Sequence, residues 1–131
     1  MRVTKENINE FIEGSSMDCS NKGITNIEYI PDGITGLNCH SNRLTELPKL
    51  PESLIGLYCG DNKLTELPIL PKSLTDLDCE DNELTELPKL PESLISLFCV
   101  DNNLPYKVTL NNLKEHNKLT KRKLILKRIC G

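Results

Sequence analysis

A cysteine at every twentieth residue constrains this chain more than any other feature of its sequence. The column consists of Cys19, Cys39, Cys59, Cys79 and Cys99. Three explanations fit such spacing: a disulfide framework, a metal site, or a structural repeat that uses cysteine at one fixed position. Each explanation implies a different kind of protein, so the residues around the cysteines have to decide between them.

The residues around each cysteine repeat with the same period. The four full units are ITNIEYIPDGITGLNCHSNR (24–43), LTELPKLPESLIGLYCGDNK (44–63), LTELPILPKSLTDLDCEDNE (64–83) and LTELPKLPESLISLFCVDNN (84–103). A degenerate half-repeat, SMDCSNKG, precedes them, and LPYK begins a further unit that breaks off. Self-similarity at a short fixed period predicts a stack of equivalent coils rather than one large core.

Each unit contains the pattern LxxLxCxxNxL, and its other half reads LxxLPxLPxSL where two prolines recur. Proline fixes φ and donates no hydrogen bond, so this half should be extended or polyproline-like rather than helical. The pattern resembles the short, proline-containing leucine-rich repeats of bacterial secreted effectors and of proteins from giant viruses of amoebae. The resemblance covers about residues 16–104. It implies an α/β repeat solenoid with parallel strands on its concave face, and a non-enzymatic protein that binds partners through that face.

Stacking would place equivalent residues in ladders with a spacing of about 4.8 Å. One buried ladder would consist of Leu37, Leu57, Leu77 and Leu97, with the cysteines packed beside it as small apolar side chains. Inward-turning amides that bond the backbone would come from Asn42, Asn62, Asn82 and Asn102. Parallel neighbouring strands do not readily give disulfide geometry, and no CxxC-type ligand cluster occurs. Packing is therefore favoured over a disulfide framework or a functional metal site.

The N-terminal sequence indicates where the protein acts. Residues 1–14, MRVTKENINEFIEG, are polar and unlike a signal peptide. No apolar run approaches the roughly 18 to 20 residues that a membrane-spanning helix needs. We therefore expect an intracellular, cytoplasmic protein with reduced thiols, in the host cytoplasm if its origin is viral.

Charge divides the chain into two unequal parts. Residues 1–104 hold 8 Lys or Arg against 18 Asp or Glu, whereas residues 105–131 hold 8 Lys or Arg against Glu115 alone. The acidic part contains the repeats, and the basic part follows them. The two parts should therefore contact different kinds of partner.

The first and last coils of a solenoid need caps. We expect residues 1–15 to form a helical cap, with a helix over 4–14. In this helix Thr4 would be the N-cap, Ile8, Phe11 and Ile12 would share the apolar face, and Gly14 would end it.

The basic C-terminal segment, residues 105–131, should form a second helical cap after the repeats of 16–104. Its pattern predicts two short helices with Thr109 and Thr120 as N-caps, and Leu110 and Leu113 facing the last repeat. The second helix would be amphipathic and could alternatively contact an anionic membrane or nucleic acid. The residues of this alternative contact are Lys121, Arg122, Lys123, Lys127 and Arg128. Nucleic acid is the less favoured partner because no RNA-binding motif or stacking aromatics accompany them.

The outward positions of the predicted strands form the candidate partner-binding site. The third unit brings four carboxylates together, and aromatic or apolar side chains flank them on both sides. Such a face would suit a basic, partly apolar protein partner, although acidic strand positions also serve to keep a small solenoid in solution. The candidate residues are Asn38, His40, Tyr58, Asp76, Asp78, Glu80, Asp81, Phe98 and Val100.

Catalytic and cofactor chemistry is not indicated by the sequence. The two histidines, His40 and His116, are far apart, and no P-loop, GxGxxG, GxSxG or HExxH pattern occurs. A strand face that is open to water would also do little to shift carboxylate pKa values. The sequence therefore predicts a protein-binding module without catalytic, cofactor or metal residues, and it leaves the oligomeric state open.

Overall fold

A computed structural model describes the backbone of residues 1–130 and the side chains of residues 1–122. Of the predicted basic contacts, Lys123, Lys127 and Arg128 therefore have side chains outside the described residues. No helix within the described part of the chain is long and apolar enough to cross a membrane. The elements are β1 (Arg2–Val3), η1 (Ile8–Phe11), β2 (Ile12–Glu13), β3 (Ser16–Asp18), β4 (Asn26–Ile27), β5 (Gly36–Asn38), β6 (Gly56–Tyr58), β7 (Asp76–Asp78), β8 (Ser96–Phe98), η2 (Leu110–Asn112) and α1 (Leu113–Cys130).

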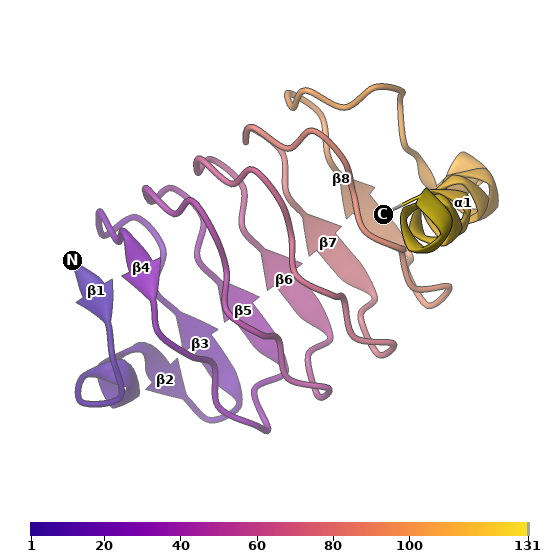
Figure 1. Cartoon of the computed structure of the whole chain (residues 1–131). Coiled ribbons are helices and arrows are strands. Elements are labelled where there is room, and N and C mark those ends of the chain that lie inside the picture. Colours follow the sequence, from indigo (N-terminus) through magenta and orange to yellow (C-terminus); the bar gives the residue numbers. More distant parts are fainter. Residues whose placement is uncertain (131) are drawn as a thin grey trace.

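The repeats stack into a solenoid whose short strands lie side by side (Figure 1). Strands β3, β5, β6, β7 and β8 are parallel neighbours in this order, and β2 extends the sheet at its N-terminal edge. The register advances by 20 residues from coil to coil, as in the pairs Leu37 with Leu57 and Leu57 with Leu77. This is the parallel-strand repeat solenoid that the sequence pattern predicted.

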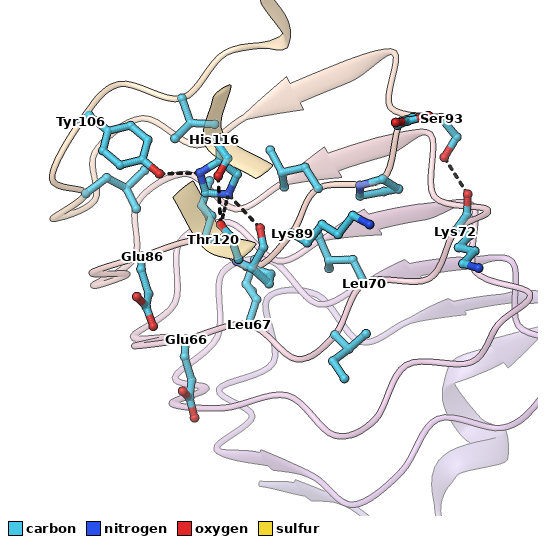
Figure 2. A pocket seen from close by; sticks show the side chains of 18 of the residues that line it. Glu66, Leu67, Leu70, Lys72, Glu86, Lys89, Ser93, Tyr106, His116 and Thr120 are labelled. Atoms are coloured by element: carbon cyan, nitrogen blue, oxygen red, sulfur yellow. Dashed lines mark hydrogen bonds between the residues drawn. The ribbon is translucent and has the colours of Figure 1, made fainter. Parts of the chain in front are cut away.

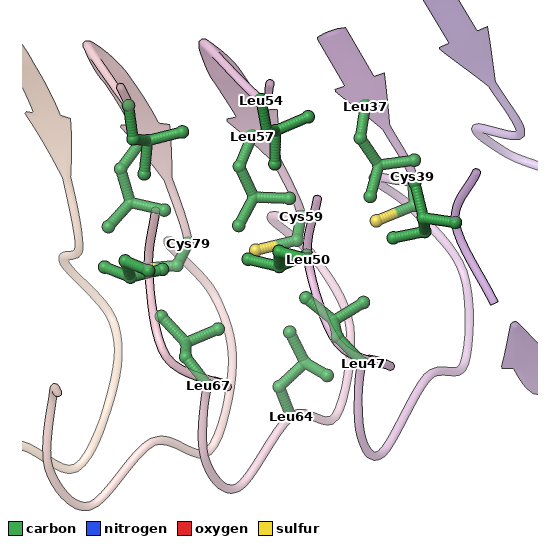
Figure 3. Close-up of a cluster of buried hydrophobic side chains, with 14 of the residues drawn as sticks. Leu37, Cys39, Leu47, Leu50, Leu54, Leu57, Cys59, Leu64, Leu67 and Cys79 are labelled. Atoms are coloured by element: carbon green, nitrogen blue, oxygen red, sulfur yellow. The ribbon is translucent and has the colours of Figure 1, made fainter. Parts of the chain in front are cut away.

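Leucine and cysteine ladders fill the interior of the stack (Figure 3). Leu37, Leu57 and Leu77 are buried as predicted, whereas Leu97 is only half-buried, because β8 is the last strand of the sheet. Leu57 and Cys59 alternate inward along β6, while Tyr58 between them points outward. Burial of one such leucine stabilises a fold by about 1.5–3 kcal/mol. Burial also raises the pKa of the Cys19 thiol to about 11, so the column behaves as the predicted apolar packing.

The predicted asparagine ladder links each coil to the one before it. Asn62 donates from its amide to the carbonyls of Cys39 (3.0 Å) and Cys59 (3.1 Å). Its Oδ1 accepts the N–H of Leu44 at 3.0 Å. One buried side chain thus satisfies backbone groups of two coils, which the turn would otherwise leave unpaired in the interior.

The proline-containing half of each coil forms no helix, as the sequence predicted, but turns where the sequence reads PxSL. The N–H of Leu54 donates to the carbonyl of Pro51 at 3.1 Å. The hydroxyl of Ser73 then crosses to the previous coil and donates to the carbonyls of Glu52 (2.7 Å) and Leu54 (2.8 Å). The serine column is therefore a second inter-coil ladder, on the convex side.

The N-terminal helix is shorter than the predicted span of residues 4–14. Its one turn, η1, has Asn7 rather than Thr4 at the N-cap position. Ile12 lies in β2, where it pairs with Met17 in an antiparallel hairpin. Gly14, at a φ of 64°, provides the first position of the two-residue hairpin turn instead of ending a helix. The cap is therefore a helical turn followed by a strand, because the sheet edge offers Ile12 backbone partners that a continued helix would not use.

The C-terminal cap is one continuous helix after η2, not the predicted pair of helices. Thr109 precedes η2 as predicted, and its N–H donates to Asn112 Oδ1 at 2.8 Å. Thr120 lies inside α1, where its hydroxyl donates to the carbonyl of His116 at 3.1 Å, so it is not an N-cap. Leu113 is buried as predicted, but Leu110 is exposed, because Val108 covers the end of the core at Cys99.

Candidate protein-binding face

The strand register brings the predicted site residues into rows on the outward face of the sheet. Asn38, Tyr58, Asp78 and Phe98 occupy one row across β5 to β8. Phe98 is 55% exposed and Val100, two residues further along, is 57% exposed. The face therefore presents an apolar corner at β8 beside the acidic strand β7.

Tyr58 lies on β6 next to Asp78 of the neighbouring strand. Its ring lies over Gly56, where an added Cβ would come within 3.0 Å of the Tyr58 hydroxyl oxygen. Desolvation, followed by the charge of Asp76, raises the pKa of Tyr58 above its usual value. Glycine at position 56 thus makes room for the ring, which joins β6 to the acidic cluster.

The carboxylates around β7 repel one another. The pKa of Glu80 is raised, chiefly by the charge of Asp78. The pKa of Asp81 is raised by desolvation and then by the charges of Asp101 and Asp61. Among the described side chains, the one ion pair is that of Lys118 with Glu115 in α1, at 3.7 Å. The acidic cluster therefore offers uncompensated negative charge to a cation.

Some of these polar residues also shape their own turns. Asp78 Oδ1 accepts the N–H of Glu80 at 3.2 Å, as Asn38 Oδ1 accepts the N–H of His40 at 3.3 Å. His40 is exposed, and its Nδ1 lies 3.0 Å from the Ser41 hydroxyl. Asn38 and Asp78 thus stabilise their own turns in addition to lying on the outward face.

A column of left-handed residues follows the strands, and the sequence pattern did not reveal it. The residues are Asn21, Ser41, Asp61, Asp81 and Asp101, with φ between 54° and 57°. Asn and Asp are enriched in this conformation because a short polar side chain tolerates it. Asp81 therefore satisfies a backbone requirement as well as belonging to the acidic cluster. The Asp-Asn pair that recurs after β6, β7 and β8 was the available signal.

The basic C-terminal segment contains the second candidate surface. Lys121 and Arg122 are exposed on α1, which lies at the C-terminal end of the stack (Figure 1). Their helix contacts the proline-containing side of the last full unit at Pro88 and Leu90 rather than the outward strand face, and they form no ion pair with a described side chain. The two candidate surfaces are therefore separate.

His116 is a contact residue that the sequence analysis missed. Only 3% of its surface is exposed, and its Nδ1 lies 2.7 Å from the Tyr106 hydroxyl (Figure 2). Its Nε2 lies 2.9 Å from the carbonyl of Pro88. The side chain borders a groove of about 1440 Å³ between α1 and the convex side of the last coils. Its position four residues before Thr120 on a polar helix gave no sign of this burial.

Comparison with known proteins supports the fold. No protein-family profile and no curated protein matches the sequence. Among solved structures, YopM from Yersinia enterocolitica WA-314 is similar, with a TM-score of 0.70 and 38% sequence identity. The similarity covers 72% of this chain but only 21% of YopM, so the chain spans about a fifth of that protein. The 20-residue pattern, the stacked parallel strands and this similarity identify the chain as a leucine-rich-repeat protein of the bacterial-effector type.

Proposed function

We propose that the chain is a non-enzymatic interaction module that binds a basic, partly apolar protein surface through its concave face. The observation that carries this proposal is the row in which exposed Tyr58 and Phe98 flank Asp78. Asp76, Glu80 and Asp81 add charge beside that row, and His40, Asn38 and Val100 extend it. The leucine-rich-repeat architecture supports a binding role for the strand face.

The chemistry of the face favours a cationic side chain next to an apolar one. A Lys or Arg of the partner would relieve the repulsion that raises the pKa of Glu80 and Asp81. An apolar side chain would cover Phe98 and Val100, which are the exposed apolar groups nearest to the cluster. Aromatic anchors of this kind often contribute most of the binding energy at an interface.

The thiols support a binding role rather than a catalytic one. Burial raises the pKa of Cys59 well above its usual value, so its nucleophilic thiolate form is disfavoured. Glu80 and Asp81 are surface groups that lack the closed, dry environment in which carboxylates act as acid and base catalysts. The buried thiols also suit a reducing compartment, and we propose action in the cytoplasm.

A second candidate function uses the basic helix. Lys121 and Arg122 project from α1 without acidic partners among the described side chains, and the sequence adds Lys123, Lys127 and Arg128. Such a segment could bind an anionic membrane or, less favourably, nucleic acid. Its binding would weaken steeply with salt, because phosphate contacts release counterions.

Affinity capture from a reducing cell lysate tests the proposal. The concave variant combines Tyr58→Ala, Asp76→Asn and Glu80→Gln and leaves Phe98 intact. A matched control removes two convex-side carboxylates by Glu46→Gln and Glu66→Gln. A third protein, the α1 variant, has glutamine at the five candidate contact positions Lys121, Arg122, Lys123, Lys127 and Arg128. Captured proteins are identified by mass spectrometry, and captured lipid and nucleic acid are assayed at low and moderate salt.

A protein that the wild type captures should be lost from the concave variant and kept by the control and the α1 variant. Loss from the control as well would mean a non-specific charge effect and would contradict the proposal. Capture of lipid or nucleic acid that disappears only in the α1 variant, and is released by salt, would favour the second candidate.

A further inference from the structure

The last strand of the sheet has an unpaired outer edge. β8 pairs with β7 only. In the coil before it, Cys79 N–H donates to the carbonyl of Phe98 at 2.8 Å and Asp81 N–H to that of Val100 at 3.1 Å. The equivalent donors one coil later, Cys99 N–H and Asp101 N–H, have no acceptor among the described residues. The ladder that holds every earlier coil therefore stops with open backbone groups.

The direction of these open groups follows from the ladder itself. Phe98 and Val100 direct their carbonyls toward β7. Because backbone groups alternate along a strand, Leu97 and Cys99 direct theirs away from β7. The Cys99 carbonyl accepts the Asn102 amide of its own coil at 3.1 Å, and its second lone pair is left for the edge. The carbonyl of Ile95 also points outward, since its equivalent, that of Thr75, accepts from Ile95 N–H at 2.8 Å. The open edge thus runs from Ile95 to Asp101.

The side chains along this edge are the least polar of any coil. Residues 95–100 read ISLFCV, whereas the equivalent residues 75–80 read TDLDCE. Ile95 is 73% exposed, in addition to the exposed Phe98 and Val100. Natural edge strands are commonly protected by charged residues or proline. An uncharged segment of six residues with aromatic and β-branched side chains instead favours further strand pairing.

The open edge borders a groove. A groove of about 600 Å³ lies between β8 and residues 104–111, with Leu104, Val108 and Leu110 in its wall. The capping segment meets the strand through the Cys99 thiol, which donates to the carbonyl of Val108 at 3.3 Å. That contact covers the core but uses none of the outward backbone groups.

We propose that β8 pairs with β8 of a second copy of this chain, antiparallel about a two-fold axis at Phe98. Phe98 would then face the partner's Phe98 as a pair without hydrogen bonds, with Cα atoms about 4.5 Å apart. Leu97 would exchange hydrogen bonds with the partner's Cys99, and Asp101 N–H would donate to the carbonyl of the partner's Ile95. Ser96 would lie opposite the partner's Val100.

This register keeps Leu97 and Cys99 on the buried face of the continued sheet and Phe98 on its outward face. Leu97 and the partner's Cys99 continue the buried ladders, while Phe98 and its symmetry mate lie on the outward face. The two acidic β7 strands would be three strand spacings apart, about 14 Å. That distance exceeds the screening length of about 8 Å at physiological ionic strength, so their repulsion would be weak. One segment thus supplies both halves of a two-fold interface, as closed dimers require.

Disulfide trapping tests the register. In a Cys130→Ser background, Phe98→Cys should form a covalent dimer under mild oxidation, because about 4.5 Å suits a disulfide. Tyr58→Cys in the same background is the matched control, since it lies in the same row two strands from the edge. Its two copies would be about 24 Å apart and should remain uncrosslinked. Equal crosslinking of both variants, or none at position 98, would overturn the proposal.

Charged substitutions at Phe98 test the proposed two-fold axis independently of cysteine chemistry. Phe98→Lys alone and Phe98→Asp alone place like charges opposite each other and should weaken dimerisation at least about tenfold in sedimentation experiments. An equimolar mixture of the two variants should form dimers again. Circular dichroism establishes that both exposed-site variants are folded. A monomeric wild type, or dimers that persist in both variants, would overturn the proposal, whereas the concave-face variants that spare Phe98 should dimerise normally.

Discussion

The two ends of the solenoid are closed in different ways. At the N-terminal end the closure is made by backbone pairing, with β1 parallel to β4 and β2 antiparallel to β3. At the C-terminal end it is made by side chains of α1. Asn117 donates to the carbonyl of Leu90 and accepts its N–H, both at 2.8 Å, and His116 contacts Pro88.

This difference separates two tasks that a cap performs. A cap covers the apolar interior of the end coil, and it also provides partners for the open backbone of the sheet. The N-terminal segment does both, because β2 supplies a strand to β3. The C-terminal segment covers the interior through Val108 and Leu113, but no described residue pairs with the outer edge of β8. Four changes probe this comparison, and we give them from the largest expected effect to the smallest.

Removal of a buried cap side chain should destabilise the N-terminal end more. Phe11→Ala should lower the free energy of unfolding by about 3 kcal/mol, and Leu113→Ala by about 2 kcal/mol. Both residues are buried, but Phe11 is larger and packs beneath a paired strand. Urea denaturation followed by circular dichroism measures both values. A larger loss in Leu113→Ala would contradict the assignment of the stronger cap to the N-terminus.

Removal of one polar cap side chain should instead destabilise the C-terminal end more. Asn117→Ala deletes both hydrogen bonds to Leu90 and leaves partly buried backbone groups unpaired, which should cost about 2 kcal/mol. The matched change is Asn7→Ala at the other end, where the side chain bonds Thr4 N–H (2.7 Å) and the carbonyl of Arg2 (2.9 Å). Those bonds are more exposed, so about 1 kcal/mol is expected. Equal losses in the free energy of unfolding in the same assay would contradict this comparison, because side-chain hydrogen bonds would then stabilise both caps equally.

Thiol labelling should report which end opens first. Cys19 and Cys99 are the end members of the buried column. We expect iodoacetamide to modify Cys99 about tenfold faster than Cys19, which corresponds to a difference of about 1.4 kcal/mol in opening free energy. Peptide mapping by mass spectrometry after timed labelling gives both rates. Faster labelling of Cys19 would mean that the paired strands open more readily than the helix.

Carboxyl titration should show a lowered pKa in the first coil and raised pKa values in the fourth. A hydrogen bond from the Ser20 hydroxyl lowers the pKa of Asp18, so its stabilising contribution is present above its unfolded pKa and is lost as pH falls through the folded value. The pKa values of Glu80 and Asp81 are raised, so their contribution is present below the unfolded pKa and is lost as pH rises through the folded value. Carboxyl NMR titrations should place Asp18 below, and the other two above, their ordinary values. Because Asp18 and Asp81 are exposed and Glu80 is only half-buried, the effect on stability should be the smallest of the four.

The repeats were predictable because every ladder position recurs at a fixed spacing. Leu57, Cys59 and Asn62 each have equivalents that identify their role, and the structure confirms those roles. The rows of the candidate face followed from the same period, although their use by a partner remains a prediction. The left-handed conformation of Asp61 and Asp81 was not predicted, because in sequence it appears only as a preference for Asn and Asp at that position.

The ends were less predictable because they occur once. Two-residue strands such as β1 and β2 are too short for an alternation of apolar and polar residues to show. Gly14 fits a helix end and a hairpin turn equally well in sequence, and the neighbouring sheet edge decides between them. His116 and Asn117 resemble exposed polar residues of a helix, since their backbone partners at Pro88 and Leu90 are distant in the chain.

The asparagine ladder has a consequence for how such a chain can change length. Each amide bonds its own coil and the preceding one through groups that every coil supplies, as Asn82 does with the carbonyls of Cys59 and Cys79. Loss or gain of 20 residues therefore restores the same hydrogen-bond partners. Loss of one residue would instead shift the amide of that coil away from its backbone partners. The matching segments LTELPKLPES at 44–53 and 84–93 fit growth by whole units. The fold thus makes large length changes easier to accommodate than small ones, and a gene can alter the number of coils while the two caps stay as they are.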